Sequence, residues 1–167
     1  MRKIFLSILL VAIIIAISTQ TFAFSQSSEK LYNGIDVSEW QGNIDFGEVA
    51  RAGIEVVYIR ASEGRGYVDP YFRENYEKAK ANGLRTGFYH FLTATNVAEA
   101  KEEAEFLLNA VKPYKVKLPL VLDLEMIDGD DGRNEKLSKE EMTKGALAFM
   151  KEIADAGYQA MPYGNIR

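Results

Sequence analysis

Short apolar segments alternate along this chain with amphipathic segments of helical periodicity, and this alternation limits the possible folds more than any other feature. The segments between the apolar runs are long enough for helical crossovers, which connect parallel strands. We therefore expect an α/β protein in which helices cover a parallel sheet. The segments that read as strands are Gly34–Ser38, Val56–Arg60, Thr86–Phe91, Leu118–Glu125 and Gln159–Tyr163.

Capping signals predict where the helices begin and end. At three places a side chain that can cap a helix precedes an acidic residue by three positions, a pattern typical of a helix N-terminus. These pairs are Asp45 with Glu48, Asn96 with Glu99, and Ser138 with Glu141. Asp69 followed by Pro70 predicts a fourth start, because proline suits the first helical turn. The predicted ends are Gly53, Gly83 and Gly157, which suit left-handed caps, and Pro113.

Polar and aromatic side chains stand at the C-terminal end of every predicted strand, and they favour a barrel over an open sheet. In (β/α) barrels the active site is built at this rim. The rim residues are Asp36, Ser38, Arg60, Glu63, Tyr89, His90, Asp123, Glu125, Tyr163 and Asn165. Five strands are too few to close a barrel. The expected fold is therefore an irregular (β/α) TIM-like barrel, truncated after the fifth strand, whose closing strands are missing from this chain or supplied in another way.

The apolar run Leu118–Glu125 ends in two carboxylates, Asp123 and Glu125. Side chains alternate along a strand, so the two acids point the same way, with Cα atoms roughly 6.6 Å apart. Like charges at this distance beside apolar neighbours raise one pKa, which is the arrangement that acid/base catalysis uses at neutral pH. The alternative is that the two acids only end a strand at a solvated loop. Asp36 has the same two interpretations, a member of the site or an acid hydrogen-bonded to a neighbouring loop.

Other residues have a mainly structural interpretation. Trp40, the only tryptophan, either plugs the barrel end, which we favour, or forms a wall that stacks on a sugar. His90 is the only histidine, so a zinc site is not expected. Gly64–Gly66 reads as a flexible loop, and Asp128–Gly132 as a surface loop that lacks the ligand spacing of an EF-hand. A solvated helix face is predicted for Glu99, Glu102, Glu103 and Glu105.

The N-terminus differs from the rest of the chain. Arg2 and Lys3 precede an apolar run that extends to Ile17, as in a secretory signal peptide. We expect a signal peptide over residues 1–23 and a short linker over 24–31; an uncleaved membrane anchor is the alternative. Residues 24–167 hold 18 basic and 24 acidic side chains, a net charge of −6, so nucleic acid is not an expected partner. The absence of cysteine excludes disulfides and thiolate chemistry.

Four motifs occur in one order along the chain. They are Gly34-Ile35-Asp36-Val37-Ser38, Val57-Tyr58-Ile59-Arg60-Ala61-Ser62-Glu63-Gly64, Gly87-Phe88-Tyr89-His90-Phe91 and Leu120-Val121-Leu122-Asp123-Leu124-Glu125. Together they resemble the family 25 glycoside hydrolases, the Chalaropsis-type lysozymes. The likeness covers residues 32–167, which would be the catalytic domain without its C-terminal strands. It implies an N-acetylmuramidase that cuts the β-1,4 bond between N-acetylmuramic acid and N-acetylglucosamine in peptidoglycan.

The resemblance also implies roles for the rim residues. Glu125 would be the general acid/base, Asp123 would stabilise positive charge and orient the substrate's 2-acetamido group, and Asp36 would lie beside them. Tyr89 and Tyr163 would line the cleft, and we add Glu63 and Trp40 as candidate substrate-binding residues. The family likeness suggests retention of configuration with the acetamido group as nucleophile. The spacing of the acids leaves this open, since their carboxyls can lie roughly 5 to 9 Å apart. Neither a metal nor another cofactor is expected.

Two other functions remain open from the sequence. One is a non-catalytic module that binds peptidoglycan. The other is a metal-dependent phosphodiesterase in which Asp36, Asp123 and Glu125 are oxygen ligands. For a lysozyme we expect the glycan strands of peptidoglycan as partner, contact with the membrane only through the export signal, a monomer, and a secreted or cell-wall location.

Overall fold

A computed structural model describes residues 31–125, 134 and 136–164 of the chain. The chain divides into two units, Met1–Leu31 and Tyr32–Arg167, and every element below belongs to the second. The predicted signal peptide, nearly all of the linker, the acidic loop Asp128–Gly132 and Asn165 lie outside the described residues. The elements are β1 (Gly34–Val37), η1 (Glu39–Gln41), α2 (Phe46–Arg51), β2 (Val56–Glu63), β3 (Tyr67–Val68), α3 (Phe72–Ala81), β4 (Arg85–Phe91), α4 (Val97–Val111), β5 (Leu120–Leu124), α5 (Lys139–Asp155) and β6 (Ala160–Gly164).

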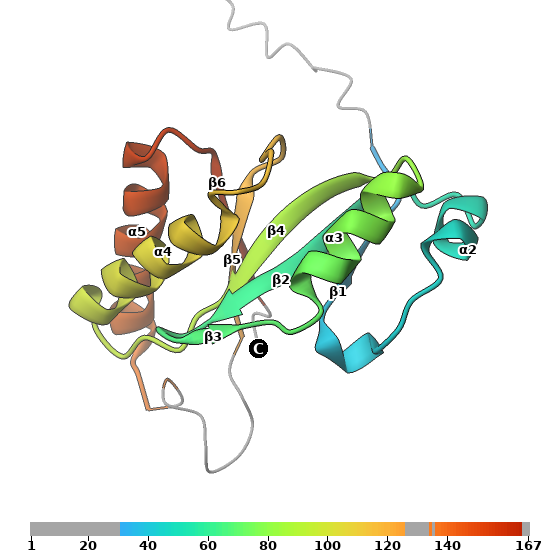
Figure 1. The fold of residues 1–167 in the computed structure, drawn as a ribbon. Helices are drawn as coiled ribbons and strands as arrows, with labels where there is room; N and C mark the ends of the chain where they lie inside the picture. Colours follow the sequence, from blue (N-terminus) through green and yellow to red (C-terminus); the bar gives the residue numbers. More distant parts are fainter. Residues whose placement is uncertain (1–30, 126–133, 135, 165–167) are drawn as a thin grey trace, which may run out of the picture. The chain divides into compact units, whose positions relative to one another are not determined.

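The five predicted strands form one curled parallel sheet in the order β1-β2-β4-β5-β6 (Figure 1). The structure adds one strand that was not predicted, β3, which forms an antiparallel hairpin with the end of β2. Gly64–Gly66, read as a flexible loop, forms the turn of this hairpin. Gly64 has a φ of 55°, a conformation that other residues rarely adopt, and this explains the glycine.

The two faces of the sheet have different surroundings. The helices α3, α4 and α5 pack against one face, where Val57, Ile59 and Phe88 have no exposed surface. Phe88 there contacts an aromatic cluster of Phe72, Tyr76 and Tyr114, with ring centroids 4.8 to 5.7 Å apart. Replacing one of these large buried side chains by alanine costs about 3–5 kcal/mol. Because side chains alternate, the intervening residues project from the opposite face.

That opposite face carries the polar strand residues. Arg60 of β2 pairs in register with Tyr89 of β4, and residues paired in this way project from the same face. Tyr58 lies on this face as well, and its ring covers Gly87, where an added Cβ would come within 2.3 Å of the ring. Glycine at this position therefore lets Tyr58 lie flat on the sheet.

The capping signals are confirmed at three helices. The side chains of Asp45, Asn96 and Ser138 accept hydrogen bonds from the third residue after each of them, at 3.0, 3.0 and 3.2 Å. The three predicted glycine ends have positive φ angles, and α4 ends just before Pro113. None of the helices in the described ranges is long and apolar enough to cross a membrane.

The predicted helix start at Pro70 is wrong by two residues, because α3 begins at Phe72. The carboxylate of Asp69 accepts a hydrogen bond from the backbone N–H of Tyr71 at 2.8 Å, which makes residues 69–71 a turn before the helix. The Asp69 carboxylate therefore does not cap α3 as predicted.

Glu103 contradicts the predicted solvated helix face, since it has no exposed surface. One of its oxygens lies 2.9 Å from His90 Nε2, and the other ring nitrogen of His90 lies 2.9 Å from the Ser62 hydroxyl. Thr93 donates to Glu103 from its backbone N–H at 3.0 Å and from its hydroxyl at 2.9 Å. Glu99 is mostly buried too, and its carboxylate accepts hydrogen bonds from the backbone N–H and the hydroxyl of Thr95. The first turns of α4 face the loop after β4, and this contact buries both acids.

Glu103→Ala should lower the free energy of unfolding by about 3–5 kcal/mol, because it leaves His90 and the Thr93 N–H buried without their partner. Glu102→Ala is the matched control on the same helix. Glu102 pairs with Arg65 at the surface and should contribute less than about 1 kcal/mol. Urea unfolding of the two variants measures both values, and equal losses would contradict the structural role of Glu103.

Candidate active site

Asp123 occupies the C-terminal end of β5, where it pairs in register with Phe91 of β4 and Tyr163 of β6. Only 9% of the residue is exposed. Its Oδ1 atom has no hydrogen-bond partner in the described part of the protein. A buried carboxylate with an unused acceptor is costly in a folded chain and is typical of a functional site.

The pKa of Asp123 is raised from 3.8 to about 7. Burial is the largest cause, the negative charges of Glu125 and Asp36 add to it, and the positive charge of Arg60 opposes it. Glu125 and Asp36 are therefore each close enough to Asp123 to affect its carboxyl group. The expectation that crowding and apolar surroundings raise one carboxyl pKa is confirmed for Asp123.

Tyr89 lies among the same groups. Burial raises its pKa most, and the charges of Asp36 and Asp123 raise it further, while Arg60 and the Ser38 side chain lower it. Its phenol is therefore protonated at neutral pH and can donate a hydrogen bond. Asp36 itself is exposed on β1, at the position paired with Tyr58.

Glu125 follows the last residue of β5 and is partly buried. Its backbone carbonyl accepts a hydrogen bond from the side-chain amide of Asn134 at 3.3 Å. The same amide nitrogen donates to the carbonyl of Leu92, 3.2 Å away, in the loop after β4. Asn134 is buried and ties the two loops together. Sequence reasoning missed this residue, because an asparagine in a polar loop carries no local signal of a long-range contact.

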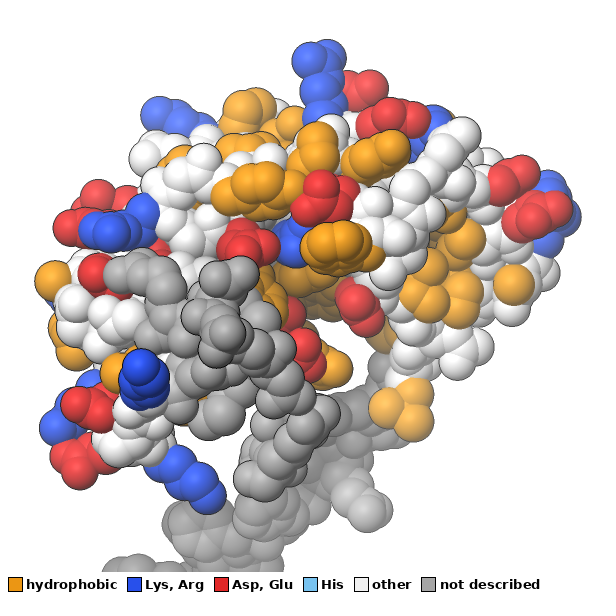
Figure 2. All heavy atoms as spheres, turned by 90° about the horizontal axis from the view of Figure 1, so that it is seen from below, with side chains coloured by type: hydrophobic (Ala, Val, Ile, Leu, Met, Phe, Trp, Pro, Cys, Tyr) orange, Lys and Arg blue, Asp and Glu red, His pale blue; other side chains and the backbone are white. Residues whose placement is uncertain are grey.

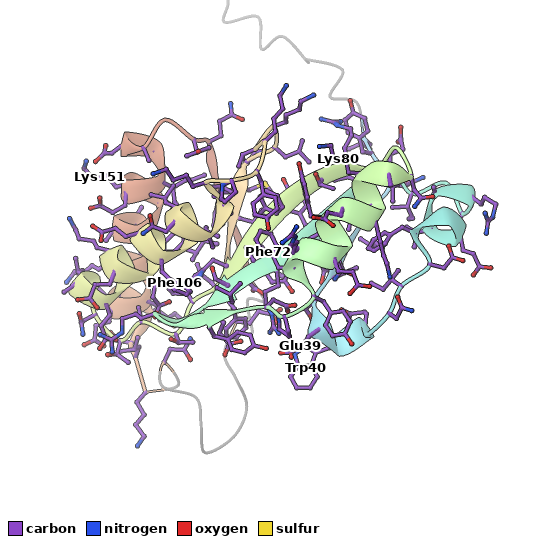
Figure 3. The ribbon with its side chains drawn as sticks, viewed as in Figure 1. Glu39, Trp40, Phe72, Lys80, Phe106 and Lys151 are labelled. Atoms are coloured by element: carbon purple, nitrogen blue, oxygen red, sulfur yellow. The ribbon has the colours of Figure 1, made fainter. Side chains whose placement is uncertain are left out.

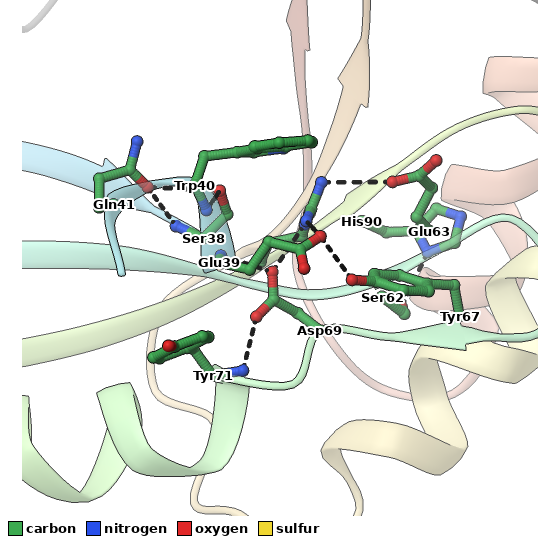
Figure 4. A network of polar contacts seen from close by, with 11 residues as sticks. Ser38, Glu39, Trp40, Gln41, Ser62, Glu63, Tyr67, Asp69, Tyr71 and His90 are labelled. Carbon is green, nitrogen blue, oxygen red and sulfur yellow. Dashed lines mark hydrogen bonds and ion pairs between the residues drawn. The ribbon is translucent and has the colours of Figure 1, made fainter. Parts of the chain in front are cut away.

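Glu63 belongs to a polar network around Arg60 (Figure 4). Arg60 Nη1 donates to Glu63 Oε2 at 3.2 Å. The register between β2 and β4 shifts between Arg60 and Ser62. Past this shift, Ser62 contacts buried His90, while Glu63 lies with Arg60. Regular alternation would place Ser62 on the face of Arg60, and the irregularity places Glu63 there instead.

The aromatic residues Trp40 and Tyr163 are both exposed. The prediction that Trp40 plugs the barrel end is wrong, since 79% of the residue is exposed. It lies in the short 3-10 turn η1, none of whose residues is buried, and its side chain projects away from the ribbon beside Glu39 (Figure 3). Tyr163 of β6 is 57% exposed. Both rings are accessible to a ligand.

Figure 2 views the protein from the side on which Trp40 lies and shows acidic and hydrophobic side chains around a hollow. No group of three or more His, Cys, Asp or Glu side chains within the described ranges is arranged to hold a metal ion. The arrangement provides a buried carboxyl group with a raised pKa, and accessible aromatic rings on η1 and β6.

Asp123→Asn should stabilise the fold increasingly as the pH rises. Because the pKa of Asp123 is higher in the folded state than its ordinary 3.8, the unfolded chain releases this proton first, and stability falls between about pH 4 and about pH 7. Asparagine removes this loss. Across this pH range the free energy of unfolding of the variant should exceed that of the wild type by up to about 4 kcal/mol.

Urea unfolding of both proteins across this pH range measures the gain. Asp155→Asn, at the exposed end of α5, is the control and should show no such trend. A constant difference between Asp123→Asn and wild type at all pH values would contradict the raised pKa.

Known proteins that are similar to this chain in sequence or structure include lysozymes and an endolysin. The autolytic lysozyme of Clostridium acetobutylicum is 38% identical over 96 residues, which are 58% of this chain and 29% of the lysozyme. The structure of the lysozyme from Streptomyces coelicolor matches with a TM-score of 0.68 and 30% identity over 81% of this chain and 64% of that one. The modular Cpl-1 endolysin, solved with a peptidoglycan analogue, matches with a TM-score of 0.62 and 33% identity over 80% of this chain and 36% of the endolysin.

The chain spans less than two thirds of the length of these relatives. The sequence profile described as glycosyl hydrolases family 25 matches residues 35–167, which include every described strand except the first residue of β1. The profile, the sequence relatives and the structural neighbours agree with one another. The chain belongs to glycosyl hydrolase family 25.

Proposed function

We propose that this protein is a lysozyme that hydrolyses the β-1,4 bond between N-acetylmuramic acid and N-acetylglucosamine in peptidoglycan. The observation that supports the proposal is the buried Asp123 carboxyl, which has an unpaired Oδ1 and whose pKa is raised to about 7 by burial and by the charges of Glu125 and Asp36. Glycoside hydrolysis uses paired carboxyl groups, one to protonate the leaving oxygen and one to stabilise positive charge. Family membership and the peptidoglycan analogue bound by the Cpl-1 endolysin support this substrate.

In this mechanism Glu125 donates its proton to the glycosidic oxygen as the bond to the sugar's C1 breaks. The carbonyl oxygen of the substrate's 2-acetamido group attacks C1 and forms a cyclic oxazolinium ion. Asp123 accepts a hydrogen bond from the acetamido N–H and stabilises the positive charge that develops there. This charge favours the ionised form of Asp123, which burial alone disfavours. Glu125 then removes a proton from water, which attacks C1 and restores the original configuration.

The remaining rim residues bind the sugar chain. The protonated phenol of Tyr89 donates a hydrogen bond to substrate, and Asp36 positions the sugar beside Asp123. The exposed rings of Trp40 and Tyr163 offer apolar faces that can lie against sugar rings. Glu63 accepts hydrogen bonds from sugar hydroxyls with the carboxyl oxygen that Arg60 does not use.

The fold proposed for the active protein is an irregular (β/α) TIM-like barrel, of which the curled sheet forms one part. The strand order β1-β2-β4-β5-β6 supports this, because neighbouring strands follow one another along the chain as they do in such barrels. We propose export through the N-terminal signal and action at the cell wall, in keeping with the autolytic lysozyme among the relatives.

Glu125→Gln should reduce peptidoglycan cleavage by at least about 100-fold, because glutamine cannot donate the proton to the leaving oxygen. The full chain is incubated with purified peptidoglycan, the products are reduced with borohydride, and the new ends are identified by mass spectrometry. The wild type should release reduced muramic acid ends. Glu105→Gln, on the exposed side of α4, is the matched control and should cleave like wild type.

Two outcomes would contradict the proposal. Cleavage by Glu125→Gln at the wild-type rate would remove Glu125 from the mechanism. A wild-type chain that sediments with peptidoglycan and releases no reducing ends would instead be a wall-binding module, the alternative that the exposed Trp40 and Tyr163 favour.

A further inference from the structure

Arg60 joins three separate segments at the end of the sheet. Only 5% of the residue is exposed. Its Nε atom donates to Asp69 Oδ2 at 2.9 Å, Nη1 to Glu63 Oε2 at 3.2 Å, and Nη2 to Glu39 Oε1 at 2.6 Å. The three acids belong to the segment before α3, the end of β2, and η1. One guanidinium therefore holds together three carboxylates that would otherwise repel one another.

These contacts fix η1, the turn that carries Trp40. Asp69 accepts a second hydrogen bond at the same Oδ2 atom, from the backbone N–H of Glu39 at 2.9 Å. At the other end of the turn, Gln41 and Ser38 form a reciprocal cap in which the Ser38 N–H donates to Gln41 Oε1 at 2.7 Å. Trp40 lies between these two anchors, so its backbone is held on both sides although its ring is exposed.

Tyr67 of the β3 hairpin contacts both Arg60 and Glu39. Its hydroxyl donates to Glu39 Oε1 at 2.5 Å, and this bond is the main cause that raises its pKa to about 12. The Arg60 guanidinium lies 5.6 Å from the centre of the Tyr67 ring, within the range of a cation–π contact. Tyr67 is 38% exposed. Figure 4 shows Trp40, Glu39 and Tyr67 in one network.

We infer that Arg60 is a positioning residue that holds Trp40 and Tyr67 as a preformed pair of aromatic surfaces for the β-1,4-linked N-acetylated sugars of a glycan chain. This inference rests on the proposed function and extends it to a residue and a ring that the sequence analysis left without a role. Rings that are fixed before binding lose little conformational entropy when a sugar stacks on them. Arg60 therefore contributes to glycan affinity more than to bond cleavage.

Arg60→Lys tests this, because lysine keeps the positive charge near Asp123 but lacks the planar fork that reaches three carboxylates. Trp40 is the only tryptophan in the chain, so tryptophan fluorescence reports on this ring alone. We expect the variant to show lower Trp40 fluorescence anisotropy. Titration with tri-N-acetylchitotriose should give a Kd at least about fivefold higher, equivalent to about 1 kcal/mol. In peptidoglycan cleavage KM should rise while kcat changes by less than about twofold.

Arg73→Lys is the matched control, since Arg73 is exposed and pairs with Glu77 on its own helix; it should match wild type in every measurement. Tyr67→Phe is a second variant that keeps the ring and removes its bond to Glu39. It tests the pair if Arg60→Lys fails to fold, and should weaken chitotriose binding with kcat unchanged.

Several results would overturn the inference. One is wild-type anisotropy together with wild-type chitotriose affinity in Arg60→Lys, or in Tyr67→Phe if Arg60→Lys does not fold. Another is a fall in kcat at constant KM. A wild-type chain that binds no chitotriose would overturn the sugar-binding role of the pair. Fluorescence and titration need no turnover, so these results are separate from a failure of the proposed cleavage.

Discussion

The burial of one face of a parallel sheet under three helices is the constraint on which the rest of this structure depends. Val57, Ile59 and Phe88 are fully buried against α3, α4 and α5. Because strand side chains alternate, this packing obliges Arg60 and Tyr89 to project from the other face. Parallel strands also bring their C-terminal ends to one edge. The polar residues of the site are thus placed together by the same apolar contacts that stabilise the fold.

The acidic residues on the polar face have two kinds of surroundings. Around Arg60, one guanidinium neutralises part of the charge of three acids and fixes their positions. Asp123 has no such partner, and burial with neighbouring negative charge raises its pKa to about 7. The carboxyl groups of the polar face therefore have two different electrostatic environments, one paired with a guanidinium and one buried without a hydrogen-bond partner at Oδ1. On the helix side, His90 and Glu103 satisfy each other in a buried contact that connects β4 to α4.

Much of this protein could be predicted from local sequence signals. The five strands and the caps at Asp45, Asn96 and Ser138 depend on residues within a few positions of one another, and the structure confirms them. The spacing of Asp123 and Glu125 at the end of an apolar strand also indicated a shared site. Four ordered motifs were enough to identify family 25. Each of these inferences uses an interaction that the chain makes with its near neighbours.

Only the tertiary structure decided which polar residues have distant partners. Nothing near Glu103 indicates that it is buried, because His90 and Thr93 reach it from the end of β4 and the loop that follows. Trp40 is exposed and not a plug, and its turn is anchored to Asp69, 30 residues away. Asn134 contacts Leu92, 42 residues away. The sequence by itself determined the elements and the placement of two acids at the end of an apolar strand, while long-range packing determined which side chains are buried, paired or accessible.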